Sequence, residues 1–254
     1  MTSRLIALGG FFGVFALLAW APLAQEHAGS HWGYGGADGP SHWGDLDKSF
    51  ATCKLGHLQS PIDIRAAKAA DLPPLQVAYL PTPLHIVNNG HTVQINYAPG
   101  SSITVGDRRY ELKQFHFHHP SEERVNGKGY VMVAHLVHAA ADGSLAVVAV
   151  LLDAKGSANP LIARLWEHLP AQEGPEKTYD DVQIDATGLL PTDRGYYTFT
   201  GSLTTPPCTE NVTWLVLKTP EPISTGQGDV FTKIYPLDAR PTQPRNGREV
   251  LMSK

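Results

Sequence analysis

Two histidines one residue apart stand in the segment Gln114-Phe115-His116-Phe117-His118. If this segment is a β-strand, its side chains alternate between two faces, so Gln114, His116 and His118 share one face and the phenylalanines point into the opposite layer. Two residues along a strand span about 7 Å, a distance that two imidazoles can close by leaning toward one metal ion. The pair is weak evidence by itself, because a single histidine on a strand is usually a hydrogen-bonded core or surface residue.

A second alternating run, Val131 to His138, could pair beside the first and present His135 on the same side. Three neutral imidazoles leave a bound Zn²⁺ its full double charge and one open position, so the pKa of a bound water falls from about 15.7 to about 7. A structural zinc takes four protein ligands, and no fourth histidine or cysteine is obviously placed. The pattern therefore favours a catalytic zinc centre at His116, His118 and His135.

Short β-strands must position these histidines. From Ser49 onward, apolar or alternating runs rich in β-branched and aromatic residues are separated by Gly, Pro, Asn and Asp. Helical periodicity is scarce: one helix is predicted after Asn159-Pro160, behind a cap and an early proline, and a weaker one near residues 224–235. No repeat, low-complexity tract or linker is found after residue 30, so residues 25–254 are predicted to form a single, mainly β domain.

Composition narrows the choice of partners. Charged residues make up 17% of the 254 residues and hydrophobic ones 42%, which is enough apolar material to bury a sizeable core. The net charge is −4, and lysines and arginines are scattered, so no basic patch is available for nucleic acid or an anionic membrane surface. A small, nearly neutral substrate fits this composition better.

The N-terminal residues are typical of an export signal. Arg4 supplies a positive charge, and Leu5 to Ala24 then carries none. We expect residues 1–24 to be a cleaved signal peptide, although Pro22 disturbs the small residues near the cleavage site. The alternative is an uncleaved anchor, which the glycines and the proline of this run weaken as a spanning helix. The mature protein is then periplasmic or secreted, with no stable membrane insertion.

Export would place Cys53 and Cys208 in an oxidising compartment. An even number of cysteines there favours a disulfide between them. Two free buried thiols are the alternative.

Seven motifs are spread from His31 to Arg248. They are HWGYGG at His31, QSPIDI at Gln59, NNGH at Asn88, QFHFHHPSE at Gln114, AHLVH at Ala134, GSLTTPPCTE at Gly201 and VTWLVL at Val212. In identity and order they resemble the α-class carbonic anhydrases. The resemblance implies a large, mostly antiparallel, twisted central sheet with a few short helices and a conical cavity. It also implies zinc at the cavity floor, carbon dioxide and bicarbonate as substrates, and, by analogy with exported bacterial relatives, a possible homodimer.

The resemblance also gives roles to single residues. Thr204 would accept a hydrogen bond from the zinc hydroxide and donate its own proton to Glu122, which orients the hydroxide; without the zinc site these residues would be an ordinary turn and a solvated charge. His91 matches the proton shuttle of the family, although alone it would be a turn residue. The matches to the hydrophilic wall that orders the shuttle waters are Tyr34, Asn89 and Gln94. The matches to the apolar substrate pocket, which simple core packing would also explain, are Val137, Val147, Leu203, Val212 and Trp214, with Thr205 beside them.

Two positions depart from the family pattern. The family usually has glutamate two residues before the third zinc histidine, where it accepts the remaining N–H of that ligand, and this chain has Val133. Glu123 stands where the family usually has histidine. We expect an exchange in which Glu123 accepts the N–H of His135, and Gln114 is a further expected support of the ligands. The alternative leaves Glu123 in solvent, with a backbone carbonyl or a water serving His135.

Three functions remain open at this point. The first is a zinc enzyme that hydrates carbon dioxide. The second is a catalytically silent binding module, a class that typically loses a zinc histidine. The third is zinc-dependent ester hydrolysis as a side activity.

Overall fold

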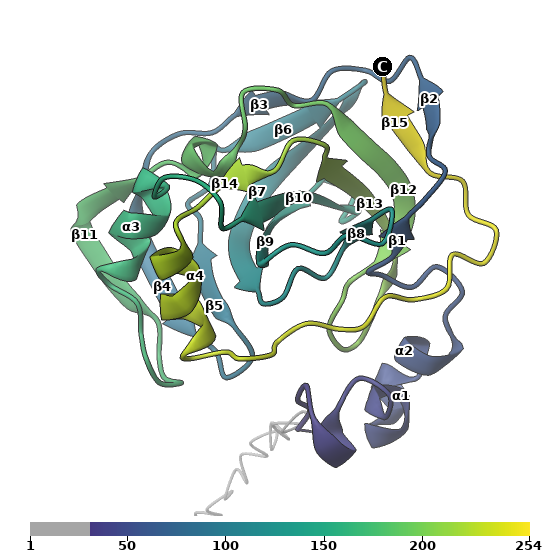
Figure 1. The fold of residues 1–254 in the computed structure, drawn as a ribbon, viewed down its shortest axis with the longest axis horizontal. Coiled ribbons are helices and arrows are strands. Elements are labelled where there is room, and N and C mark those ends of the chain that lie inside the picture. Colours follow the sequence, from purple (N-terminus) through teal and green to yellow (C-terminus); the bar gives the residue numbers. More distant parts are fainter. Residues whose placement is uncertain (1–30) are drawn as a thin grey trace, which may run out of the picture.

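The computed structural model describes residues 31–254, so the predicted signal peptide lies outside the described residues. Thirteen strands form one twisted sheet, whose main path is β11-β4-β5-β7-β9-β10-β13-β12-β15-β2, with β3, β6 and β14 attached beside it (Figure 1). Their bounds are β2 Lys68–Ala70, β3 Gln76–Ala78, β4 Thr82–Asn88, β5 Val93–Asn96, β6 Ser102–Val105, β7 Arg108–His118, β9 Met132–Ala139, β10 Leu145–Asp153, β11 Lys177–Ile184, β12 Tyr196–Ser202, β13 Glu210–Leu217, β14 Glu221–Pro222 and β15 Leu251–Ser253. The separate pair is β1 Asp63–Ile64 with β8 Arg124–Val125.

Most neighbouring strands are antiparallel, including the run β4-β5-β7-β9-β10 at the centre. The parallel pairs are β1 with β8, β10 with β13, β10 with β14, and β15 with β2. The predicted fold class, a mainly β protein built on a large and mostly antiparallel sheet, is confirmed.

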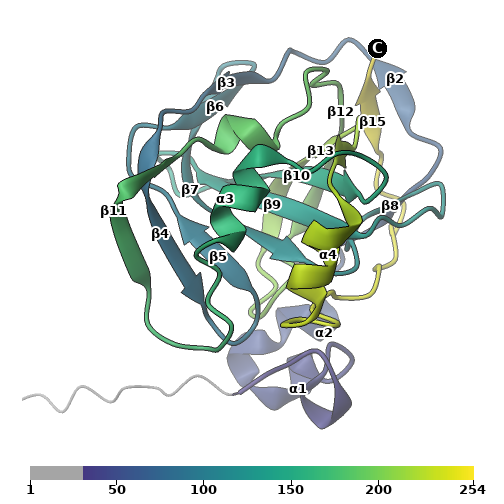
Figure 2. The ribbon, with the colours of Figure 1, turned by 60° about the vertical axis from the view of Figure 1, so that its left-hand side comes forward.

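Two helices cover one face of the sheet (Figure 2). Helix α3, Pro160–Trp166, begins where the sequence predicts, because the Asn159 side chain accepts the N–H of Ile162. Helix α4, Thr225–Thr232, begins at a capping box formed by Ser224 and Gln227. The remaining helices are η1 Gly36–Asp38, α1 Trp43–Leu46, η2 Lys48–Phe50, α2 Thr52–Leu55 and η3 Ala186–Leu189. Among residues 31–254, no helix has the length and apolar character needed to cross a membrane.

The sheet separates two hydrophobic cores. Even-numbered residues of β10 pack with α3 and α4 in the larger core, and odd-numbered ones pack in a second core on the opposite face. Strand alternation produces this division, because successive side chains of a strand point to opposite faces. On the larger-core side Leu165 and Phe231 are fully buried, and each such side chain contributes about 1.5–3 kcal/mol to folding.

A β-bulge decides which residues of β7 face the second core. The register of β7 against β9 slips at Lys113, so this strand has one extra residue there. Leu112 before the bulge and Phe115 after it both face the larger core, although they are three residues apart. An extra residue exchanges the two faces of a strand beyond it. The bulge therefore directs His116 and His118 away from the larger core.

Candidate metal centre

Three histidines converge where β7 and β9 pair. His116 lies directly opposite His135, and His118 lies opposite Val133. The ring centroids are 4.9 Å apart for His116 and His118, 5.5 Å for His116 and His135, and 4.9 Å for His118 and His135. One nitrogen of each ring lies within 4.8 Å of the others. Imidazoles at this spacing can share one metal ion.

Each ring also has one nitrogen engaged by a protein oxygen. His116 Nδ1 is 2.8 Å from the Gln114 side-chain oxygen, and His118 Nδ1 is 2.7 Å from the main-chain oxygen of Asp238. His135 Nε2 lies 3.2 Å from each carboxylate oxygen of Glu123. An oxygen acceptor requires the facing nitrogen to carry the ring proton, so the other nitrogen keeps its lone pair. Three lone pairs are thus available to a metal, and the rings are held in orientation from behind.

The charges around the rings also suit a cation. Glu122 and Glu123 are 2% and 0% exposed. Glu122 Oε2 is buried without a hydrogen-bond partner in the described part of the chain, as is His118 Nε2, 3.7 Å away. Glu122 Oε2 also lies 3.8 Å from His135 Nδ1. Because buried polar atoms are nearly always paired, these orphaned atoms indicate a place for a bound cation, and the donor set fits zinc.

The pKa values of two rings follow from burial and nearby charge. Burial lowers the pKa of His116 well below its ordinary value, and the neighbouring His118 and His135 lower it further. Burial also lowers the pKa of His118, but the carboxylates of Glu122 and Asp238 outweigh it and the net shift is upward. Burial and the two neighbouring rings therefore favour the neutral form of the His116 ring, which is the form that can bind a metal.

Thr204 and Glu122 are close to the centre, but the predicted hydrogen bond between them is not formed. Thr204 is buried and lines the cavity beside the histidines. Glu122 Oε1 accepts the main-chain N–H of Arg240 at 2.7 Å, and Oε2 faces the imidazole nitrogens of His118 and His135. The carboxylate is thus fixed by Arg240 and directed toward the metal centre.

Two hollows meet above the histidines. Both are lined by Gln114, His116 and Thr205. The first, about 200 Å³, has an apolar wall of Val137, Leu145, Val147, Leu203 and Trp214. The second, about 110 Å³, is more polar and is lined by Trp32, Tyr34, Asn89, His91, Thr92 and Gln94. The predicted wall residues are brought together except Val212, which is 1% exposed and packs in the second core behind the apolar wall.

His91 stands in the polar hollow, on the turn between β4 and β5. Its ring stacks on Trp32 with 3.7 Å between centroids and 7° between planes. Asn89 Oδ1 accepts the N–H groups of His91 and Thr92, which fixes the turn. Burial lowers the pKa of His91, His31 lowers it further, and Glu173 opposes them.

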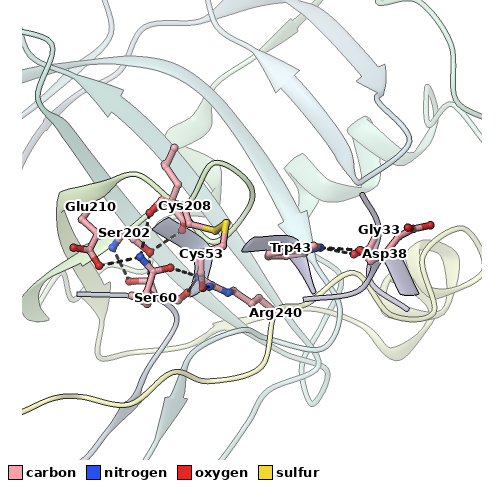
Figure 3. Close-up of a disulfide and its surroundings, with 11 residues drawn as sticks. Gly33, Asp38, Trp43, Cys53, Ser60, Ser202, Cys208, Glu210 and Arg240 are labelled. Carbon is pink, nitrogen blue, oxygen red and sulfur yellow. Dashed lines mark hydrogen bonds between the residues drawn. A yellow bond between two sulfur atoms is a disulfide. The ribbon is translucent and has the colours of Figure 1, made fainter. Parts of the chain in front are cut away.

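The predicted disulfide between Cys53 and Cys208 is confirmed (Figure 3). It joins α2 to the turn that follows Thr204, and the Cys208 N–H donates to Thr205 O at 2.8 Å. The guanidinium of Arg240 donates to the main-chain oxygen of Cys53. In the chain-entropy model a cross-link across 155 residues stabilises the fold by about 5 kcal/mol. A disulfide of this kind is typical of an oxidising, extracellular compartment.

Several residues of this site are not predicted from the sequence. Leu145 could have been found, because it stands two residues before Val147 on the same strand face. Trp32 lies inside a recognised motif, but its contact with His91 is long-range. The Asp238 carbonyl has no sequence signal, because every residue has a main-chain oxygen.

A three-histidine metal centre below an apolar and a polar wall defines a metalloenzyme with a small-molecule substrate. Residues 38–254 match the family model for eukaryotic-type carbonic anhydrases. A carbonic anhydrase of a Nostoc species is 46% identical over 226 residues, covering 87% of this chain and 85% of that protein. A carbonic anhydrase of Neisseria gonorrhoeae is 44% identical over 241 residues, covering 94% of each. The solved α-carbonic anhydrase of Thermovibrio ammonificans, in complex with sulfanilamide, has a TM-score of 0.85 and 43% identity, covering 89% of this chain and all of that one.

The chain belongs to the α-carbonic anhydrase family. Members of the family are generally zinc-dependent enzymes that hydrate carbon dioxide, and their small-molecule substrates are carbon dioxide and bicarbonate. Membership does not favour the alternative of a silent binding module.

Proposed function

We propose that this chain catalyses the reversible hydration of carbon dioxide to bicarbonate and a proton, with zinc held by His116, His118 and His135. The observation that carries the proposal is the convergence of three imidazoles, each with its outer nitrogen opposite a protein oxygen. Bound zinc supplies a Lewis acid that lowers the pKa of a water to about 7, so that hydroxide is available at neutral pH.

The apolar wall holds the substrate. Carbon dioxide has neither charge nor dipole, so Val137, Val147, Leu203 and Trp214 suit it better than polar groups would. Thr204, beside this wall, has a hydroxyl that can orient the attacking oxygen toward the substrate carbon. Glu122 Oε2, which is buried and accepts no hydrogen bond from residues 31–254, is the acceptor that we propose for the Thr204 proton.

The residues of the polar wall line the route by which the proton leaves. His91 lines the same hollow as His116 and His118, together with Tyr34, Asn89 and Gln94. An imidazole with a pKa near neutrality can accept a proton through a short chain of waters and release it to buffer. Gln94 donates to Asn96 Oδ1 at 2.7 Å, and its side-chain oxygen, which accepts no hydrogen bond from residues 31–254, can order those waters.

Glu123 replaces the glutamate that the family usually has at position 133. Its carboxylate contacts His135 Nε2 from the segment before β8, and Val133 fills the usual position with an apolar side chain that is fully buried. The pairing supports the exchange proposed from the sequence: a carboxylate still fixes the third histidine, but it comes from another part of the chain.

We also propose that the protein is exported and that its signal peptide spans residues 1–24. The disulfide supports this location. N-terminal sequencing of the exported protein checks the cleavage, and light scattering checks the homodimer that the analogy with exported relatives suggests.

One experiment tests the activity. Carbon dioxide hydration and hydrolysis of an activated ester are measured on the same preparation, before and after a chelator removes the metal, with zinc content determined in parallel. We expect both rates to fall with zinc and to return when zinc is restored, with hydration far the faster reaction. Hydration that survives complete zinc removal would refute the proposal. Ester turnover without hydration would favour the esterase alternative.

A further inference from the structure

The segment between α3 and β11, residues 170–176, is bound to the turn that carries His91. The Gly174 N–H donates to Asn88 O at 3.1 Å, and the Asn88 side chain donates to Pro170 O at 3.1 Å. Farther along, the Asn96 side chain donates to the carboxylate of Glu176. The two bonds to Asn88 hold the segment at the end of β4, next to the turn, and the bond to Asn96 ties the end of the segment to the end of β5 that lies away from the turn.

The same bonds place the carboxylate of Glu173 over Gly90, the residue before His91. A Cβ atom at Gly90 would lie 2.9 Å from the Cδ and Oε2 atoms of Glu173, so the carboxylate packs directly on the main chain of the turn. Gly90 has a φ of +83°, which L side chains rarely adopt. The close contact and the left-handed backbone both explain glycine at this position.

His91 has few charged neighbours. Its ring is stacked on Trp32, whose segment also brings in His31, and the groups across the hollow are Tyr34, His116 and His118. Burial and His31 both oppose a proton on the ring. The carboxylate of Glu173 instead raises the pKa of His91. A carboxylate near an imidazole favours the protonated ring.

We propose that Glu173 is a positioning residue for proton export: held over Gly90 by the 170–176 segment, it stabilises the charged form of His91 at the mouth of the cavity. The proposal rests on the proposed shuttle role of His91. The proton that leaves the cavity resides on the imidazole, and Glu173 balances its charge until a buffer base in solution removes it. Glu173 does not contact the reacting atoms. Its effect is to lengthen the time for which the proton stays on His91.

The titration of His91 tests this directly. NMR follows the His91 ring signals against pH in the zinc-loaded protein, in Glu173→Gln, and in Glu167→Gln as a matched control, since Glu167 is also exposed and lies near the same segment. We expect the His91 midpoint to move to lower pH by a few tenths of a unit in Glu173→Gln, as for other exposed charge pairs, and to stay in place in Glu167→Gln. His31→Gln should move it in the opposite direction.

Kinetics give the second readout. With little buffer, Glu173→Gln should lower kcat and displace its pH profile to lower pH, while kcat/KM for carbon dioxide stays the same and added imidazole buffer restores kcat. An unmoved His91 midpoint, or a kcat equal to that of Glu167→Gln, overturns the role of Glu173. The proposed shuttle role of His91 is tested separately by His91→Ala. If His91 is not the shuttle, this variant has normal turnover at low buffer, and this result does not depend on the His91 titration midpoint measured in Glu173→Gln.

Discussion

The substitution Glu123→Gln tests how the third histidine is supported. Glutamine keeps the shape of the side chain and removes its charge, and Glu123 is 0% exposed, so solvent cannot replace the lost interaction. A hydrogen bond to a charged group contributes about 1.5–3 kcal/mol and one between neutral groups about 0.5–1.5 kcal/mol. The difference of about 1–1.5 kcal/mol corresponds to roughly tenfold in an equilibrium constant.

The geometry of the Glu123–His135 contact favours a loss of zinc affinity at the lower end of the usual range. Removing a group that supports a metal ligand costs about 10–100-fold in metal affinity or activity. Both carboxylate oxygens lie 3.2 Å from His135 Nε2, which is the long end for an N–H donor. We therefore expect zinc to bind about tenfold more weakly in Glu123→Gln.

Zinc loss into a competing chelator measures this, at one pH and with Glu167→Gln as the control of equal charge change. Glu173 is unsuitable as a control because it packs on Gly90 beside His91. Folding is checked by thermal unfolding with saturating zinc. The double variant Glu123→His with Val133→Glu restores the usual family pattern and should retain zinc nearly as well as the unmodified protein. Equal zinc loss from Glu123→Gln and Glu167→Gln would refute the role of Glu123.

Four further outcomes are expected. His135→Ala should lose both stoichiometric zinc and hydration activity, since two ligands bind zinc poorly, and metal analysis with a rate assay checks both. His91→Ala should lower turnover at low buffer and recover in imidazole buffer; insensitivity to buffer would remove His91 from proton export. Replacing Cys53 and Cys208 by serine should lower stability by about 2–5 kcal/mol in denaturant unfolding. Burial lowers the pKa of His138 to about 3, against 6.5 for a free histidine. Its contribution to stability is therefore complete above pH 6.5 and is lost as the pH falls toward 3. His138→Gln should reduce this loss of stability between pH 6.5 and 3 in denaturant unfolding, and an unchanged dependence on pH would contradict the prediction.

The sequence alone predicted the proposed zinc ligands and much of the fold. Residue type and alternation predict the strands around His116 and His135, because a strand repeats every two residues and the histidines keep that period. The cap at Asn159 predicts the start of α3 for an equally local reason. The even number of cysteines predicts the disulfide, since exported chains seldom leave a pair of thiols free.

The tertiary structure decided which face each ligand takes and what holds it. The bulge at Lys113 exchanges the faces of β7, and nothing near Lys113 in the sequence marks it, because register depends on packing against β5 and β9 together. The oxygen that orients His118 belongs to the main chain of Asp238, 120 residues away, where side-chain identity has no influence. The contact of Glu173 with Gly90 likewise depends on how two distant segments are hydrogen-bonded. The local sequence thus identifies the groups that can bind zinc, whereas long-range backbone pairing sets their orientation. The sequence does not reveal this pairing, because main-chain donors and acceptors are the same for nearly every residue.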